Sequence, residues 1–100
     1  MQLSQYYVYI IGNRYRTVLY VGITGNLHLR VEEHKRETFE GFTKQFNVKY
    51  LLYYEIWDSA DKAIAREKQL KKWHRQWKID LIKETNPTFR DLSSDLGTCA

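Results

Sequence analysis

The sequence predicts an α+β domain with a small three-stranded antiparallel sheet flanked by helices, in the order β-β-α-β-α-α. Two aromatic-rich apolar runs around a polar break indicate a hairpin, and a third, nearly continuous apolar run indicates another strand. Apolar residues at helical spacing follow both parts. One hundred residues suffice for a single domain, expected over residues 1–90. Residues 91–100 carry two Asp and no cation, and we expect them to be a loose, disordered tail.

The hairpin is expected to join residues 6–11 and 17–23 through a four-residue loop at 13–16. In that register Tyr9 lies directly opposite Tyr20, so both phenols share one face of the sheet. A shift by one residue would separate them. Tyrosines on strands most often only pack, and the hairpin alone favours that interpretation.

The first helix is expected to begin after Thr24 or Asn26, either of which suits an N-cap, and to end near Arg36. Arg30 and His34 are four residues apart and therefore share a face of this helix. Such a pair most often lies on a solvated surface.

The third strand is expected at residues 48–57, VKYLLYYEIW, after a loop at 41–47. The almost unbroken apolar run indicates burial on both faces and therefore a central position in the sheet.

From residue 59 the apolar residues recur at helical spacing, and Glu67 interrupts their stripe. This carboxylate could be a boundary residue that pairs with Lys71 one turn later. The run REKQLKKWHRQWK at 66–78 has six cations and one acid, and a further short helix continues to Glu84. Asn86, which precedes a proline, is expected to end it.

The basic run suits a nucleic acid. Cations around a helix, interleaved with Trp73, His74 and Trp77, can contact phosphates and stack on bases or sugars. The same composition also fits a solubilising helix whose tryptophans face the core. Sixteen Lys and Arg against twelve Asp and Glu give a net charge of +4, which favours an anionic partner without identifying it.

Composition disfavours several other classes. The single cysteine, Cys99, cannot form a disulfide framework or a cysteine-based zinc site. No apolar run approaches the roughly 20 residues of a membrane span, and the N-terminus does not resemble a signal peptide. We therefore expect no membrane partner and a cytoplasmic location.

The joint spacing of these residues is more specific than any one of them. Tyr9 is followed after ten residues by Tyr20-Val21-Gly22, Arg30 lies ten residues beyond Tyr20, His34 follows four residues later, and Glu67 lies on a later helix. This arrangement resembles the GIY-YIG nuclease family over residues 6–92. LYVGITGNLHLRVEEHK, GFTK, AIAREKQLKKW and NPTFRDL resemble its small stand-alone bacterial members.

The resemblance implies hydrolysis of phosphodiester bonds with Mg²⁺ or Mn²⁺. It implies that Tyr9 orients or deprotonates the attacking water and that Tyr20 supports it. Arg30 would neutralise the charge that develops on the phosphoryl group. His34 would assist proton transfer, and Glu67 would bind the metal. Gly22 would keep the strand end open to the substrate. The residues expected to bind substrate are Gly22, Thr43, Lys44, Lys68, Lys71, Lys72, Arg75 and Asn86.

Physical chemistry is compatible with these roles. Mg²⁺ commonly keeps several waters, so the single carboxylate of Glu67 can suffice. A tyrosine with its ordinary pKa near 10 forms phenolate at pH 7 at a cost of about 4 kcal/mol. Tyr9 therefore either takes a proton with help from Arg30 and the metal, or only positions the water.

We expect a small nuclease that acts on DNA rather than RNA, with branched or damaged DNA as candidate substrates and DNA repair as its setting. A non-catalytic nucleic-acid-binding module with a vestigial carboxylate site is the alternative. A scaffold for a repair complex is a third hypothesis.

Overall fold

The computed structural model describes residues 5–13, 18–36 and 48–96, and it has the predicted fold. The elements are β1 (Tyr6–Gly12), β2 (Leu19–Thr24), α1 (Leu27–Lys35), β3 (Tyr50–Trp57), α3 (Ala60–Lys72), α4 (Arg75–Thr85) and the 3₁₀ helix η1 (Leu92–Leu96). The three strands pair antiparallel in one sheet, as expected.

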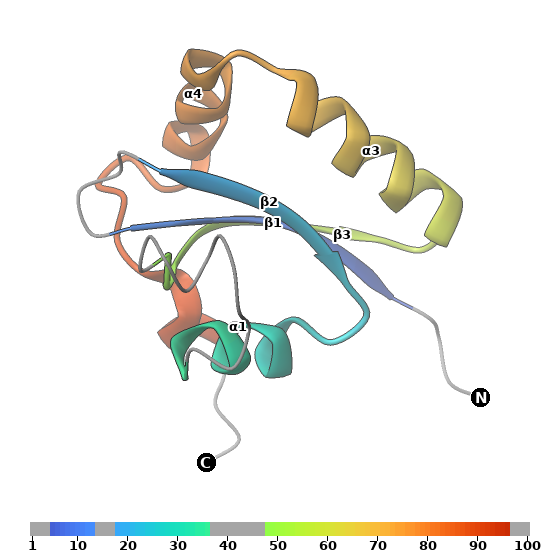
Figure 1. Ribbon diagram of the computed structural model, residues 1–100, viewed down its shortest axis with the longest axis horizontal. Coiled ribbons are helices and arrows are strands. Elements are labelled where there is room, and N and C mark those ends of the chain that lie inside the picture. The colour runs from blue at the N-terminus through green and yellow to red at the C-terminus, as the bar shows by residue number, and fades with distance from the viewer. Residues whose placement is uncertain (1–4, 14–17, 37–47, 97–100) are drawn as a thin grey trace.

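The sheet lies between two helical layers. Figure 1 shows α3 and α4 on one face of the sheet, with α1 and η1 on the other. Side chains alternate between the two faces of each strand, so they form two cores. The upper core, under α3 and α4, contains Val8, Ile10, Val21, Leu52, Tyr53, Ala63, Leu70 and Ile82. The lower core, over α1, contains Tyr9, Ile11, Leu27, Val31, Val48, Leu51 and Leu92.

The strand order is β2-β1-β3, so the prediction that the third strand is central was wrong. β1 is central, and β3 is an edge strand. The run in β3 is nevertheless buried on both faces, because Leu51 belongs to the lower core while Leu52 and Tyr53 belong to the upper one. The pairing register with β1 shifts between Ile10 and Ile11, and the irregularity lets consecutive residues pack on the same side.

The hairpin register also differs from the prediction, by two residues. Gly12 pairs with Leu19, and Tyr9 faces Gly22 rather than Tyr20. Asn13 accounts for the longer connection, because its backbone N–H donates to the Val18 carbonyl at 3.3 Å and its side chain accepts from the Val18 N–H at 3.2 Å. A shift of two residues preserves the face of each side chain, so the two tyrosines still share one.

The helix boundaries follow local chemistry. Asn26 is the N-cap of α1, because its side chain accepts from the Leu29 N–H at 3.1 Å. The basic run does not form one helix: α3 ends at its C-cap Trp73, and α4 begins after His74, where both residues have extended backbone conformations. No helix in the described ranges is long and apolar enough to cross a membrane.

The expected loose tail is corrected for residues 91–96. Asp91 forms an ion pair with Lys35 at 2.5 Å and accepts from the Leu51 N–H at 3.1 Å, which fastens this segment to α1 and β3. Leu92 then enters the lower core. Residues 97–100 lie outside the described ranges.

Candidate active site

The phenol of Tyr9 forms the floor of the candidate site. Tyr9 lies on the central strand, and its ring crosses Gly22 of β2, where an added Cβ would be 2.4 Å from Cζ and from the hydroxyl oxygen. Gly22 therefore makes room for this ring, whereas the sequence suggested that it keeps the strand open to a substrate. Tyr9 is only 2% exposed, so its phenol lies below the surface rather than on it.

The hydroxyl of Tyr9 lies 3.3 Å from Nε2 of His34, which projects from the last turn of α1. The two rings meet edge to face, with centroids 6.0 Å apart. Burial, with a further contribution from the Arg30 charge, lowers the pKa of His34 from 6.5 to about 4. The imidazole is therefore neutral at pH 7 and can accept the phenolic proton.

Burial also raises the pKa of Tyr9 above its ordinary value, and it outweighs the opposite effect of the Arg30 charge. Forming phenolate at pH 7 therefore costs more than the roughly 4 kcal/mol of an ordinary tyrosine. At rest the pair consists of a neutral phenol and a neutral imidazole.

Tyr20 and Arg30 complete the lower part of the site. The Tyr20 ring lies 6.0 Å from the His34 ring, and it is half-buried, so it is more accessible than Tyr9. Arg30 lies on α1 one turn before His34, with Nε 3.6 Å from a carboxylate oxygen of Glu33. Its charge lowers the pKa of both Tyr9 and His34, in each case as a smaller effect than burial.

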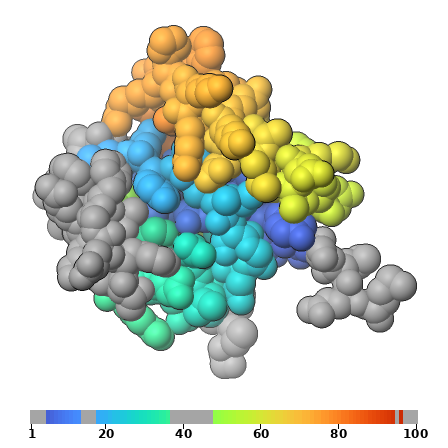
Figure 2. Space-filling view, turned by 45° about the vertical axis from the view of Figure 1, so that its right-hand side comes forward, coloured from blue at the N-terminus to red at the C-terminus, as the bar shows by residue number. Residues whose placement is uncertain are grey.

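Glu67 comes from the opposite helical layer. Figure 2 shows α3 above β2, with α1 below it, on one face of the molecule. The Glu67 side chain is 15% exposed, and its charge is among those that raise the pKa of Tyr9. Because β2 is an edge strand, groups from both layers can meet around its outer side. Tyr9 and Glu67, which the sequence places on separate elements, are thus near enough for the Glu67 charge to affect the pKa of Tyr9.

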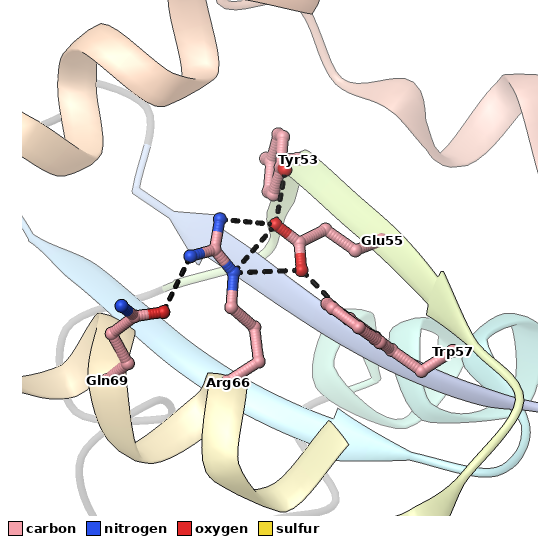
Figure 3. A network of polar contacts seen from close by, with 5 residues as sticks. All are labelled: Tyr53, Glu55, Trp57, Arg66 and Gln69. Carbon is pink, nitrogen blue, oxygen red and sulfur yellow. Dashed lines mark hydrogen bonds and ion pairs between the residues drawn. The ribbon is translucent and has the colours of Figure 1, made fainter. Parts of the chain in front are cut away.

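A polar network that the sequence analysis did not identify holds α3 on its other side (Figure 3). The Arg66 guanidinium donates to both carboxylate oxygens of Glu55 on β3, at 2.8 to 3.1 Å. Glu55 also accepts from the Tyr53 hydroxyl at 2.5 Å and from Nε1 of Trp57 at 2.9 Å. Burial raises the pKa of Glu55, but the bonds from Arg66, Tyr53 and Trp57 outweigh it, and the net pKa is lowered.

This network bears directly on Glu67. Successive helical residues point about 100° apart, so Arg66 and Glu67 flank the buried stripe that contains Ala63 and Leu70. Arg66 is tied to β3, and Glu67 lies on the side toward β2. The alternating Tyr, Glu and Trp on one face of β3 was the only sequence signal for this arrangement.

Apart from Gly22, the predicted substrate-binding residues fall into three groups. Lys68, Lys71, Lys72 and Arg75 are exposed on α3 and the first turn of α4. Asn86, in contrast, is 2% exposed. Its side chain donates to the Leu52 and Arg90 carbonyls and accepts from the Arg90 N–H, so we correct its assignment to a structural role. Thr43 and Lys44 lie outside the described residues.

The donor set fits a magnesium ion better than a metal held by protein alone. Among the described residues, no group of three or more His, Cys, Asp or Glu side chains could hold a metal. Magnesium needs only one or two carboxylates when water and substrate phosphate supply the other ligands. The Lys71 ammonium lies 3.1 Å from a Glu67 oxygen, so this carboxylate already attracts a cation.

The fold defines a class: small α+β domains with a three-stranded antiparallel sheet between two helical layers, here with a hydrogen-bonded phenol and imidazole in the lower core. Residues 5–80 match the family model described as the GIY-YIG catalytic domain. The chain therefore belongs to the GIY-YIG family, in which nuclease activity is the activity that the domain suggests.

Relatives of similar length support this assignment. The UPF0213 protein of Staphylococcus aureus (strain Mu3 / ATCC 700698) is 33% identical over 82 residues, which cover 82% of this chain and 99% of the relative. The UPF0213 protein of the Mu50 strain matches equally well. The solution NMR structure of the UPF0213 protein BH0048 from Bacillus halodurans superposes with a TM-score of 0.56. The two sequences are 21% identical, and the superposition covers 94% of this chain and 98% of the BH0048 chain. This similarity supports the fold.

Proposed function

We propose that this protein is a Mg²⁺-dependent endonuclease that hydrolyses phosphodiester bonds in DNA, and that Mn²⁺ can replace Mg²⁺. The observation that carries the proposal is the hydrogen-bonded pair of Tyr9 and His34, whose pKa values respond to the charge of Arg30 and, for Tyr9, to that of Glu67. A hydrogen-bonded phenol and imidazole, a guanidinium and a carboxylate are the groups that such a hydrolysis requires.

The proposed proton path runs through the Tyr9–His34 pair. The Tyr9 hydroxyl orients the attacking water from the floor of the site. As the new P–O bond forms, Tyr9 takes a proton from the water and passes its own to Nε2 of His34, 3.3 Å away. This transfer avoids a free phenolate, which the raised pKa of Tyr9 disfavours, and instead forms a transient imidazolium, which at a pKa of about 4 costs about 4 kcal/mol at pH 7.

Arg30, Tyr20 and Glu67 act around that pair. The Arg30 guanidinium stabilises the negative charge that develops on the phosphoryl oxygens, and the Tyr20 hydroxyl supports the water from a more exposed position. Glu67 would hold the metal, which supplies positive charge to the phosphate and lowers the pKa of water when bound. The P–O bond to the leaving oxygen breaks, that oxygen takes up a proton from solvent water, and His34 returns its proton through Tyr9 to solvent.

DNA is the proposed substrate because exposed cations lie beside the site and the chain has a net charge of +4. A domain of this size offers little surface for reading base sequence, so we propose recognition of backbone and shape, as in branched or damaged DNA. A role in DNA repair and a cytoplasmic location belong to the same proposal.

One observation favours the alternative of a non-catalytic nucleic-acid-binding module. The Lys71 ammonium neutralises Glu67 across 3.1 Å, and a metal would have to displace it. In that alternative the basic surface binds nucleic acid and the carboxylate has no metal to hold.

A cleavage assay separates the two. Supercoiled plasmid, single-stranded DNA, a branched DNA junction and RNA are incubated with the protein in Mg²⁺, Mn²⁺ or EDTA, beside the variants Glu67→Gln and Tyr9→Phe. We expect metal-dependent cleavage of DNA, reduced by about 100-fold or more in both variants. The matched controls Glu84→Gln and Tyr7→Phe, an exposed acid on α4 and another phenol of β1, should retain activity. Salt-sensitive binding without cleavage of any substrate would reject the enzyme in favour of the binding module.

A further inference from the structure

Trp77 is an exposed aromatic side chain at the corner where α3 meets α4. It lies in the first turn of α4, and 53% of it is exposed. Its ring nevertheless has fixed neighbours: the centroid lies 5.9 Å from that of Trp73 and 5.0 Å from that of His74, each nearly perpendicular to it. Trp73 packs against the upper core, and the Arg66 guanidinium lies 5.2 Å from its ring centroid. Trp77 is thus supported from within and open to solvent outside.

The corner that carries this ring is rich in cations because α3 ends and α4 begins within the basic run, at Trp73 and His74. The turn brings the last residues of α3, with Lys71 and Lys72, next to the first turn of α4, with Arg75. Burial lowers the pKa of Lys78, and repulsion from the Arg75 charge lowers it further. An anion bound here would relieve that repulsion.

An aromatic face among cations matches the chemistry of a single nucleic-acid strand, which offers phosphates and unstacked bases together. In an intact duplex both faces of each base are already stacked on neighbouring bases. A ligand that only needed charge neutralisation would gain nothing from an exposed indole.

We infer that Trp77 stacks on an unpaired base while the neighbouring cations hold the adjoining phosphates, so that the preferred substrates contain a single-stranded segment. Glu67 precedes Trp73 by six residues, which corresponds to about 9 Å along the helix axis. The Trp77 ring centroid lies a further 5.9 Å from that of Trp73. A base held there is therefore a few nucleotides from the candidate active site. The inference deepens the proposed function, on which its relevance to cleavage rests, but the binding event does not require catalysis.

Binding is best measured without metal, so that cleavage cannot interfere. Fluorescence anisotropy in EDTA follows a labelled 15-nucleotide oligothymidine and a labelled 30-base-pair blunt duplex, each titrated with the protein. The variants are Trp77→Leu, which keeps an apolar side chain, and Trp77→Phe, which keeps an aromatic one. Ile56→Ala on β3, at the opposite edge of the sheet from β2 and 56% exposed, is the matched control, and a thermal melt checks each fold.

We expect Trp77→Leu to weaken binding of the single strand by about tenfold and binding of the duplex by less than about twofold. Trp77→Phe and Ile56→Ala should stay close to the unaltered protein. The slope of log affinity against log salt should not change in Trp77→Leu, because the indole contacts no phosphate. Equal weakening on both ligands, or none on either, would overturn the inference.

The two proposals fail separately. If the unaltered protein cleaves no substrate but its single-strand binding depends on the aromatic ring, the nuclease proposal falls and this inference stands. If cleavage occurs and Trp77→Leu affects neither ligand, only the inference falls.

Discussion

The phenol ring of Tyr9 lies across Gly22 of the neighbouring strand, in space that any side chain at residue 22 would occupy. The two residues pair directly, and a Cβ on Gly22 would stand 2.4 Å from two atoms of the Tyr9 ring system. The same placement brings the Tyr9 hydroxyl to His34. One missing side chain therefore sets the position of the central hydroxyl of the site.

Gly22→Ala tests this relationship. The added methyl group must displace the Tyr9 ring within a packed core, and we expect a loss of about 1–3 kcal/mol in the free energy of unfolding. Tyr9→Ala removes the obstacle, so adding Gly22→Ala to that variant should cost much less. Urea unfolding of the four proteins in a double-mutant cycle measures the coupling. Additive effects of the two substitutions would contradict the close contact.

His34 should make stability depend on pH. Its pKa is about 4 in the folded protein and near 6.5 in an unfolded chain, so the unfolded state binds more protons between these values. The free energy of unfolding is therefore unaffected by the protonation of His34 above about pH 6.5. It falls as the pH is lowered toward 4, by about 3 kcal/mol in total. Chemical unfolding of the unaltered protein and of His34→Gln across this range provides the measurement. We expect a flatter profile for the variant, and parallel profiles would show that the His34 pKa is not lowered.

The Glu55–Arg66 ion pair should act on Glu67 through the orientation of α3. Arg66→Met leaves the Glu55 carboxylate without its main partner, and we expect a loss of about 3 kcal/mol in stability, which Glu55→Gln in the same chain should partly restore. Arg66→Lys keeps the charge but loses the bidentate geometry.

If this pair positions Glu67, Arg66→Lys should raise the metal concentration needed for half-maximal cleavage while leaving KM for DNA nearly unchanged. Glu84→Gln serves as the control. Unchanged metal dependence in a folded Arg66→Lys protein would limit the network to a structural role.

Asn86 should contribute to the stability of the fold and not to the binding of substrate. Its amide holds the Leu52 carbonyl and closes the turn to Arg90, in which Phe89 adopts a left-handed backbone with φ of 56°. Asn86→Ala should therefore lower the free energy of unfolding by about 2 kcal/mol or more. Affinity for DNA, measured by anisotropy well below the melting temperature, should stay within about twofold. A stable variant with much weaker binding would return Asn86 to the substrate-binding surface.

The sequence was sufficient for the fold class and for the face shared by Tyr9 and Tyr20, because residue periodicity carries both. It was insufficient for the register, since the strands tolerate a shift of two residues without moving any side chain to the other face. In the observed register the side chain of Asn13 accepts a hydrogen bond from the Val18 N–H, a contact that periodicity alone does not predict.

The order of the strands in the sheet could not be predicted from the sequence either, because burial has more than one cause. Burial on both faces usually marks a central strand, but here two helical layers and a local shift in register bury Leu51, Leu52 and Tyr53 on an edge strand. The burial of Tyr9 and the hydrogen bonds from Arg66 to Glu55 likewise depend on contacts between segments that are distant in the chain. The alternation of Tyr, Glu and Trp in β3 places three side chains on one face, but it does not identify Arg66 as their partner.

In the proposed site, Glu67 from the upper helical layer meets Tyr9, Tyr20, Arg30 and His34, from the lower layer and the hairpin, around one metal ion. Paramagnetic Mn²⁺ tests it most directly, because a bound ion broadens the NMR signals of nearby groups. Titration of the isotope-labelled protein should selectively broaden the signals of Tyr9, Tyr20, Arg30, His34 and Glu67, and Glu67→Gln should abolish the effect. Broadening centred on other residues, or unchanged in Glu67→Gln, would contradict the account.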